Sequence, residues 1–408
     1  MREIVAEVAG RLADHRTDPG GTAGSLAQGA AGIALLHAEL ASADGGADAH
    51  AQAAAAHLSA AAEAVRSGAV LPPGLFEGPV AFAFAATRTP ELAERFRSEL
   101  AVVDRRIDAR LPIRLRPELR RIGASLPGAT FDAYDVVAGV TGVGRYLLDR
   151  DHEPSAGLIS VLEYLTALTR PLTGPTYQLP GWWVAHARRR VAFDEPDDGE
   201  GHANLGLAHG VCGPLALLAL AWRAGVRVPE QDLAITRIVD WLLARRVPDG
   251  QGRCWPGALS RSDLESGRAA PPSARPGWCY GAPGTARAIQ LAGMALHRPE
   301  WTAVAVSSTR ELLADAVVGD EEDGLCHGRA GILHLTGLVG ADAGDRWILE
   351  RTATVATRIV ERYDPRRPSG FATDAGLLRG AAGIALALHA YARGSRPVTG
   401  WDAALLVS

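Results

Sequence analysis

Cysteine, lysine and long hydrophobic runs are all scarce in this sequence. The chain has 4 cysteines among its 408 residues, and every one of its 42 basic residues is arginine. So few cysteines do not indicate a disulfide framework, and metal binding or catalysis better explains some of them. The longest apolar runs, such as residues 214–222, are well short of the roughly 20 residues needed to span a bilayer. We therefore expect no transmembrane segment.

A broad basic surface is also missing. The net charge is -4 and the longest basic block is the arginine triplet at 188–190, which argues against nucleic-acid binding. Residues 1–15 carry acidic residues among their apolar positions instead of a continuous hydrophobic stretch, which argues against a secretory signal. We predict an amphipathic helix there, in a cytoplasmic protein.

The rest of the composition is that of an ordinary soluble protein of considerable size. Hydrophobic residues make up 47% of the chain and charged residues 22%. A length of 408 residues exceeds the usual size of one hydrophobic core. Two domains, a large barrel or a closed repeat are therefore expected.

A short glycine frame recurs along the chain and favours the repeat. The frame reads x-G-x-x-G, with alanine once in place of the second glycine, and an apolar helical stretch follows it. Its seven copies have their first glycines at Gly29, Gly78, Gly139, Gly210, Gly281, Gly328 and Gly380. The spacing of 47 to 71 residues leaves room for a second helix and loops in each repeat.

Each repeat is predicted to be a helix pair. Intervening stretches such as 233–246 and 346–363 carry apolar residues at helical spacing. Small residues in the first turn of the framed helices let backbones approach closely. The sequence thus predicts an all-α fold in which seven pairs form an α/α toroid, a single domain over residues 1–408. An open solenoid is the alternative, and closure is favoured because the framed helices are apolar nearly all round.

Comparison between repeats singles out two residues, Cys326 and His327, directly before Gly328. The equivalent positions hold Leu378 and Arg379 in the last copy. They hold Ala and Gln in the first copy, at positions 27 and 28. The fold therefore does not require Cys or His at these positions.

Other repeats also carry reactive side chains near the frame. Asp135 stands four residues before its glycine, His209 directly precedes its glycine, and Cys279 is equivalent to Cys326. Equivalent positions lie at one height on neighbouring inner helices of a ring, so these side chains should converge at one mouth of the barrel. Two thiolates and an imidazole are ligands that zinc prefers, and three protein ligands leave a fourth position open for catalysis.

Simpler explanations exist for each residue. Taken alone, a cysteine here is a small buried hydrophobe and a histidine a hydrogen-bonded core group, but the matched positions favour a metal site. Asp135 could instead cap a helix, and Arg275 could be an exposed charge in the loop 251–277. Cys212 and Cys254 have no matching position and are interpreted as structural. No role is assigned to the histidines at positions 186 and 202.

Five stretches carry a family resemblance. YDVVAGVTG, LPGWWV, NLGLAHGVCGPLALL, RPGWCYGAPG and GLCHGRAG resemble, in the same order, blocks of the lanthionine synthetase C-like family, which includes lanthipeptide cyclases of the nisin cyclase type. The resemblance extends over essentially the whole chain and is most distinctive over 134–338. It implies an α/α toroid with a small inserted region, and variable insertions are expected near 85–130 and 151–204.

The resemblance also implies a chemistry. The family's reaction is the zinc-assisted addition of a peptide cysteine thiol to dehydroalanine or dehydrobutyrine, which closes a (methyl)lanthionine thioether ring. Carried over residue by residue, it implies one zinc ion bound by Cys279, Cys326 and His327. It implies that His209 and Asp135 form the acid/base pair and that Arg275 assists at the reacting carbonyl. Trp278 and Tyr280 match positions that flank the metal.

These residues suit the reaction on chemical grounds. A thiol with a pKa of about 8.5 becomes a thiolate at neutral pH when it is bound to zinc. Its attack on the alkene produces an enolate, which His209 can protonate while Arg275 stabilises the oxygen. Asp135 would orient the imidazole or favour its charged form.

The expected partners follow from the same resemblance. The substrate is a dehydrated precursor peptide, and a separate dehydratase must supply it because the repeat fills the chain. A membrane-associated biosynthetic complex is compatible with the sequence although it has no membrane segment. Two alternatives stay open: a relative that adds glutathione to dehydroamino acids in proteins, and a non-enzymatic zinc scaffold in which Asp135 and Arg275 would be idle.

Overall fold

The computed structural model describes residues 1–16, 24–43, 48–67, 74–150, 153–175, 177–185, 201–247, 254–267, 270–273, 275–314, 322–371 and 373–408. Helices dominate these residues, as predicted. They are α1 (Arg2–Ala13), α2 (Ala30–Ala43), α3 (Asp48–Arg66), α4 (Gly78–Ala86), α5 (Pro90–Arg95), α6 (Arg97–Gly123), α7 (Phe131–Tyr134), α8 (Val140–Arg150), α9 (Ala156–Leu168), α10 (Cys212–Arg223), α11 (Gln231–Leu243), α12 (Arg261–Ser266), α13 (Ala282–Leu296), α14 (Pro299–Ala314), α15 (Arg329–Ala343), α16 (Arg346–Glu361), α17 (Ala381–Arg393) and the 3-10 helix η1 (Trp401–Leu405).

The described strands are few and short. They form two antiparallel pairs, one of β1 (Leu172–Gly174) with β2 (Tyr177–Leu179) and one of β3 (Ala203–Asn204) with β4 (Ala258–Leu259). The strands β1, β2 and β3 lie within 151–204, where an insertion was expected, whereas β4 lies outside the two expected regions. Position 186 and the arginine triplet at 188–190 lie outside the described residues.

The chain divides into two compact units. Unit 1 contains residues 1–107 and 317–404 together with Ser408, and unit 2 contains residues 108–316 and 405–407. Both units are built from the predicted repeats, because every frame glycine lies at or just before the start of a helix. The prediction that each frame begins a helix is confirmed.

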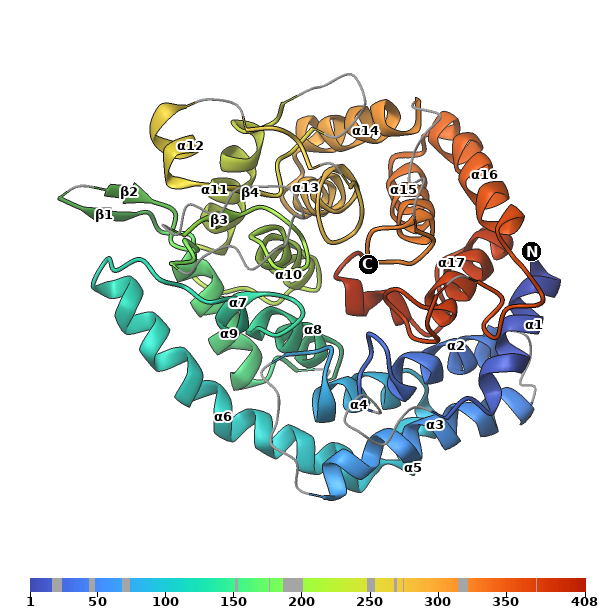
Figure 1. The fold of residues 1–408 in the computed structure, drawn as a ribbon. Coiled ribbons are helices and arrows are strands. Elements are labelled where there is room, and N and C mark those ends of the chain that lie inside the picture. Colours follow the sequence, from blue (N-terminus) through green and yellow to red (C-terminus); the bar gives the residue numbers. More distant parts are fainter. Residues whose placement is uncertain are drawn as a thin grey trace. The chain divides into compact units, whose positions relative to one another are not determined.

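Unit 1 has two layers of helices. Its framed helices pack in the order α15, α17, α2, α4, and the second layer places α16 on α15, α1 on α17 and α3 on α2 (Figure 1). The framed layer is buried all round, as in α4, where every residue from Pro79 to Ala86 is buried. Helix α16 buries only one face, including Ile348, Val355 and Ile359. This is the contrast between inner and outer helices that the sequence pattern predicts.

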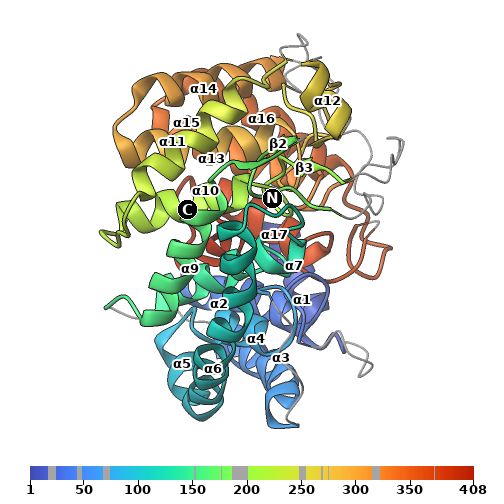
Figure 2. The same ribbon diagram turned by 90° about the vertical axis from the view of Figure 1, so that its left-hand side faces the viewer.

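Unit 2 repeats the arrangement with three pairs. Helix α10 packs against both α8 and α13, while α9, α11 and α14 form the second layer on them (Figures 1 and 2). Residues Cys212–Ala221 of α10 are all buried. The strand β3 directly precedes the loop that leads into α10, so the β3–β4 pair supports the segment that carries His209.

Backbone hydrogen bonds join the loops in front of neighbouring framed helices. In unit 1, Cys326 N–H donates to the carbonyl of Leu378 at 2.8 Å, and Leu378 N–H donates to that of Ala27 at 3.1 Å. Glycine makes this approach possible, because a Cβ on Gly324 would lie 2.8 Å from the Cα of Arg379. Equivalent positions of consecutive repeats are thereby brought side by side within the unit.

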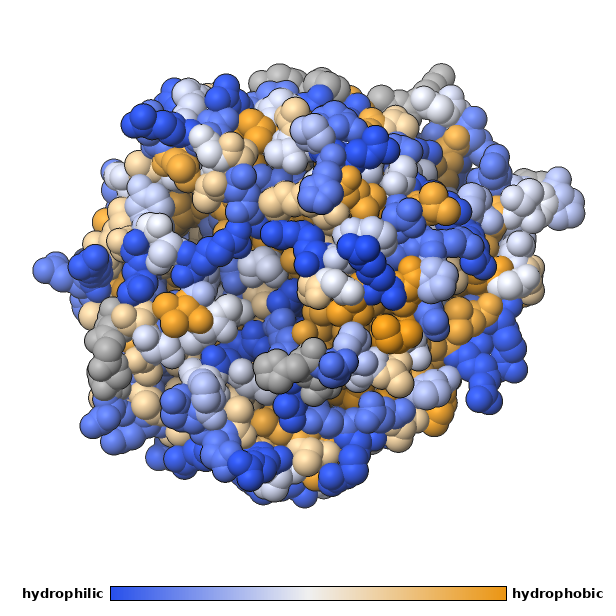
Figure 3. Space-filling model, turned by 180° about the vertical axis from the view of Figure 1, so that it is seen from behind, coloured by the Kyte–Doolittle hydropathy of each residue, from blue (hydrophilic) through white to orange (hydrophobic). Residues whose placement is uncertain are grey.

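The surface mixes residue types. Hydrophilic and hydrophobic residues are interspersed over the face shown in Figure 3, with some hydrophobic residues gathered near its centre. Among the described helices, none combines the length and the apolar character that crossing a membrane requires.

Candidate active site

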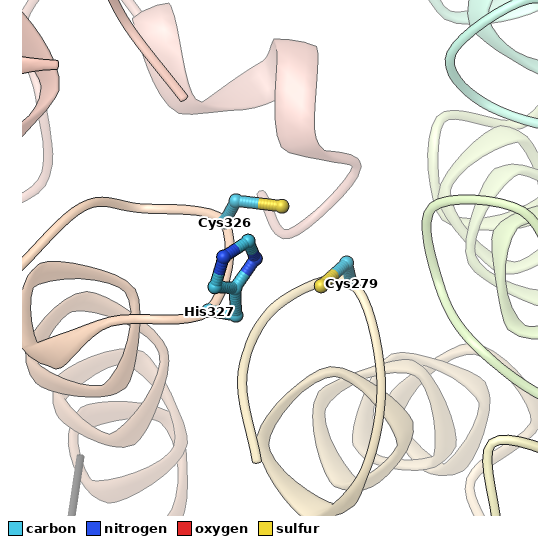
Figure 4. Close-up of side chains that lie close together, drawn as sticks. All are labelled: Cys279, Cys326 and His327. Atoms are coloured by element: carbon cyan, nitrogen blue, oxygen red, sulfur yellow. The ribbon is translucent and has the colours of Figure 1, made fainter. Parts of the chain in front are cut away.

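Three of the predicted ligands lie together. The sulfur atoms of Cys279 and Cys326 and a ring nitrogen of His327 are all within 4.8 Å of one another. Figure 4 shows the three side chains gathered at the tips of two loops. Zinc forms bonds of about 2.3 Å to sulfur and about 2.0–2.1 Å to imidazole nitrogen, which puts tetrahedral ligand atoms roughly 3.5–3.8 Å apart. Two thiol sulfurs and an imidazole nitrogen are donor atoms of the kinds that zinc binds.

The Cys326–His327 pair sits in an irregular loop directly before α15. The Nε2 atom of His327 lies 3.0 Å from Oε2 of Glu322, and the Nε atom of Arg379 lies 3.7 Å from the same oxygen. A hydrogen bond with Cys326 raises the pKa of His327, and the Glu322 carboxylate adds to this effect, whereas burial opposes it.

The predicted acid/base pair is in direct contact. The Nδ1 atom of His209 lies 2.5 Å from Oδ2 of Asp135. The Asp135 side chain is fully buried, whereas 33% of the His209 side chain is exposed. The Tyr134 hydroxyl donates to the main-chain carbonyl of His209 at 3.1 Å. With Nδ1 in contact with the carboxylate, Nε2 is the ring nitrogen through which the predicted proton transfer would pass.

Asp135 has a second set of partners. Its Oδ1 atom accepts hydrogen bonds from the N–H groups of Ala138 at 2.6 Å and Gly139 at 2.7 Å, in the turn that leads into α8. The two oxygens therefore divide their contacts, one with the backbone and the other with the imidazole. The simpler explanation, a residue that stabilises the helix start, and the proposed role in orienting His209 are compatible.

The loop of Cys279 lies against the loop of His209. The N–H groups of Leu207 and Ala208 donate to the carbonyl of Cys279 at 3.0 and 3.4 Å. Gly206 allows this contact, because a Cβ there would lie 2.4 Å from the same carbonyl oxygen. Unit 2 thus brings a predicted zinc ligand next to the predicted proton donor.

The residues around Cys279 differ in their surroundings. Trp278 is fully buried, and its indole N–H donates to the carbonyl of Leu405 at 2.8 Å. The Tyr280 hydroxyl accepts a hydrogen bond from the side-chain amide of Asn204 at 3.1 Å. The Arg275 side chain is exposed, four residues before Cys279 in the same loop. The role of Arg275 at the reacting carbonyl stays a prediction.

The other two cysteines have different environments. Burial raises the pKa of Cys212 to about 12 and that of Cys254 to about 11. The Cys212 thiol lies 3.8 Å from the hydroxyl of Thr285. Thiols with such pKa values stay protonated at neutral pH, which agrees with a structural role. His202 is fully buried, with its ring 5.6 Å from that of Phe131.

Sequence reasoning missed one position in the repeats. In three copies the residue six places before the frame glycine is polar: Asn204, Glu322 or Asp374. The side chain of each makes a hydrogen bond or an ion pair with a residue of its own loop. Arg275 occupies the same position in its own copy. Alignment of the seven copies beyond the frame itself would have revealed this shared polar position.

The chain is similar to known proteins. The family model described as "Lanthionine synthetase C-like protein" matches residues 22–406. The nisin biosynthesis protein NisC of Lactococcus lactis subsp. lactis is 24% identical over 343 residues, which cover 82% of this chain and 77% of that protein. The solved structure of nisin cyclase matches with a TM-score of 0.79 at 21% identity, covering 100% of this chain and 96% of that one. The structural match confirms the predicted all-α toroid. The chain belongs to the lanthionine synthetase C-like family.

Proposed function

We propose that this protein is a zinc-dependent lanthipeptide cyclase. It would add cysteine thiols of a dehydrated precursor peptide to dehydroalanine or dehydrobutyrine residues and so form (methyl)lanthionine rings. Family membership supports the reaction class. The observation that carries the proposal is the arrangement in unit 2, where the loop of the thiol ligand Cys279 is hydrogen-bonded to the loop of the His209–Asp135 pair.

The proposed zinc ligands are Cys279, Cys326 and His327, whose donor atoms lie within 4.8 Å of one another. A zinc ion bound there would lower the pKa of a substrate thiol and supply a thiolate at neutral pH. Three protein ligands leave a fourth tetrahedral position for the substrate sulfur.

The reaction removes one proton from the thiol, adds one proton at the α-carbon and needs no redox partner. The thiol loses its proton, a bond forms between sulfur and the β-carbon, and the π electrons of the alkene move toward the carbonyl oxygen. The α-carbon then takes up a proton, so the product has the same mass as the reactant. The peptide thus needs a general acid near its α-carbon, close to the point where the sulfur is held.

His209 is the proposed acid. Its imidazole is one-third exposed, and Asp135 holds the ring through Nδ1 at 2.5 Å. A buried carboxylate at that distance orients the imidazole and sets the direction in which Nε2 points. Arg275, exposed in the loop before Cys279, is proposed to stabilise the negative oxygen of the enolate.

The proposal extends to the partners of the reaction. A separate dehydratase would supply the dehydrated precursor peptide, and the location would be cytoplasmic. A non-enzymatic zinc scaffold is less well supported. It gives no reason for a fully buried Asp135 to contact the imidazole of His209, whose side chain is one-third exposed.

The test separates metal binding from proton transfer. We expect His209→Ala to retain one zinc per chain but to close rings about 10²- to 10⁴-fold more slowly, because general acid catalysis is lost. Cys279→Ala, the matched control, should lose zinc and activity together. Unreacted cysteines of a dehydrated precursor are counted by thiol alkylation and mass spectrometry, since cyclisation itself leaves the mass unchanged.

Two results would contradict the proposal. Undiminished cyclisation by His209→Ala would remove that residue from the mechanism. Addition of glutathione to an isolated dehydroamino peptide, with no ring closure on any precursor, would favour the glutathione-adding alternative.

A further inference from the structure

The segment 405–407 is buried in unit 2. Residues Leu405, Leu406 and Val407 are each 0% exposed. Leu406 also has a backbone φ of 55°, in the left-handed region that side chains other than glycine rarely adopt. Such a conformation persists only when surrounding contacts hold it.

Two buried hydrogen bonds supply those contacts. The indole N–H of Trp278 donates to the carbonyl of Leu405 at 2.8 Å, and Nε of Arg287 donates to the carbonyl of Val407 at 2.8 Å. Both donor side chains are fully buried. Loss of an acceptor would leave a buried donor unsatisfied, which is costly in a protein interior and most costly for a guanidinium.

The two donors belong to one structural element. Trp278 directly precedes Cys279 in a turn that is closed by hydrogen bonds from Gly277 N–H to the carbonyl of Tyr280 and from Gly284 N–H to that of Gly277. Helix α13 continues from this turn and carries Arg287. The segment 405–407 therefore binds both the turn that carries Cys279 and the helix that follows it.

We propose that Trp278 is a positioning residue and that its hydrogen bond to the segment 405–407 holds Cys279 in the geometry that zinc requires. This inference rests on the proposed role of Cys279 as a ligand. Partners that orient a ligand from outside the coordination sphere commonly change metal affinity by about 10- to 100-fold. The indole holds the residue directly before Cys279, while the N–H groups of Leu207 and Ala208 hold the Cys279 carbonyl.

The test removes the indole donor, and the control below matches the accompanying loss of side-chain volume. Trp278→Phe keeps an aromatic ring in the core and removes the N–H that reaches Leu405. We expect zinc affinity to fall by about 10-fold or more, measured by competition with a chromophoric chelator. The charge-transfer band of the Co²⁺-substituted protein, which reports sulfur–metal bonding, should change at the same time.

Trp255→Phe is the matched control. Trp255 is also fully buried in unit 2, and its indole N–H donates to the carbonyl of Leu242 at 3.0 Å. Both variants lose one buried hydrogen bond, so both should lower the midpoint of urea unfolding to a similar degree. Only Trp278→Phe should weaken zinc binding and alter the Co²⁺ spectrum.

The outcomes distinguish this inference from the proposed function. Unchanged zinc affinity in Trp278→Phe, or an equal loss in Trp255→Phe, would overturn the positioning role while Cys279→Ala still abolishes binding. Zinc retained by Cys279→Ala would overturn both. Should Trp278→Phe fail to fold, Arg287→Met removes the other hydrogen bond to this segment, and unchanged zinc affinity in that variant would reject the inference that the segment 405–407 holds Cys279 in place.

Discussion

The loop from Glu322 to Gly328 and the loop from Asp374 to Gly380 occupy equivalent places in consecutive repeats of unit 1. Their backbones make the same hydrogen bonds: Gly331 N–H donates to the carbonyl of Gly324 at 3.3 Å, and Gly383 N–H donates to that of Gly376 at 3.3 Å. In each loop the residue two places before the frame glycine donates its N–H to the next repeat. The first loop carries Cys326 and His327, whereas the second carries leucine and arginine at those positions.

This difference shows that the features that form the loop are distinct from the side chains that could bind a metal. The main chain and its glycines form the loop in both repeats, and two side chains decide whether it can bind a metal. Even the polar position six residues before the glycine is used differently, because Glu322 contacts His327 whereas Asp374 accepts a hydrogen bond from Gly376 N–H. If the comparison is sound, side chains can be exchanged between the loops without loss of the fold.

The largest expected effect comes from making the first loop like the second. The double variant Cys326→Leu/His327→Arg should lose zinc altogether, because two of the three proposed ligands are gone. Its free energy of unfolding without metal should stay within roughly 1 kcal/mol of the unsubstituted protein, because the hydrogen bonds of the loop come from the backbone. Metal analysis and urea unfolding measure the two effects.

The reciprocal double variant Leu378→Cys/Arg379→His is the control and should keep a single zinc per chain. An unfolded Cys326→Leu/His327→Arg protein would show that these side chains also build the loop, and the comparison would fail.

A smaller effect tests the shared scaffold. A Cβ on Gly324 would lie 2.8 Å from the Cα of Arg379, and one on Gly376 would lie 2.4 Å from the Cα of Gln28. Both neighbours are backbone atoms, so Gly324→Ala and Gly376→Ala should each lower the free energy of unfolding by about 1–3 kcal/mol.

Gly337 in α15 provides the contrast for these two variants. Nothing lies within 4 Å of a Cβ added there, so Gly337→Ala should raise the free energy of unfolding by about 0.5–1 kcal/mol. Urea unfolding of the three variants measures these changes. An unchanged free energy of unfolding in Gly324→Ala would mean that the neighbouring loops are not tightly packed.

The smallest effect concerns the shared acidic position. Glu322→Gln removes the carboxylate 3.0 Å from Nε2 of His327, so zinc affinity should fall by roughly 10-fold. Asp374→Asn changes the equivalent residue, which contacts only the backbone in this loop, and should leave zinc affinity unchanged. Chelator competition on both variants measures the difference, and equal affinities would show that Glu322 does not support His327.

The repeat made much of this architecture predictable from sequence. The glycine frame located all seven framed helices. It also indicated which positions of consecutive repeats lie side by side, because glycine is needed where two backbones approach closely. The strands β1 to β4 were not foreseen, because elements of two or three residues are too short to show a periodic pattern. For Asp135 the sequence suggested the helix cap and the contact with His209 as alternatives, and the structure shows that the side chain makes both contacts.

Contacts between distant segments were the hardest to predict. The apolar residues 405–407 carry no local signal, and their burial depends on Trp278 and Arg287, more than a hundred residues away in the sequence. The contact of Glu322 with His327 depends on the irregular course of the loop, which neither helical nor strand periodicity describes.

The make-up of unit 1 has a consequence for the order of folding during synthesis. Helices α2 and α4 leave the ribosome early, but α2 packs against α17, which is made near the end of the chain. Most of unit 2, by contrast, is one continuous stretch, 108–316, and its helices meet partners that are already close in sequence. Because domains generally fold as units during translation, unit 2 is able to assemble while the amino-terminal helices of unit 1 still expose apolar surface. Those helices are the part of the nascent protein with the greatest need for chaperone protection.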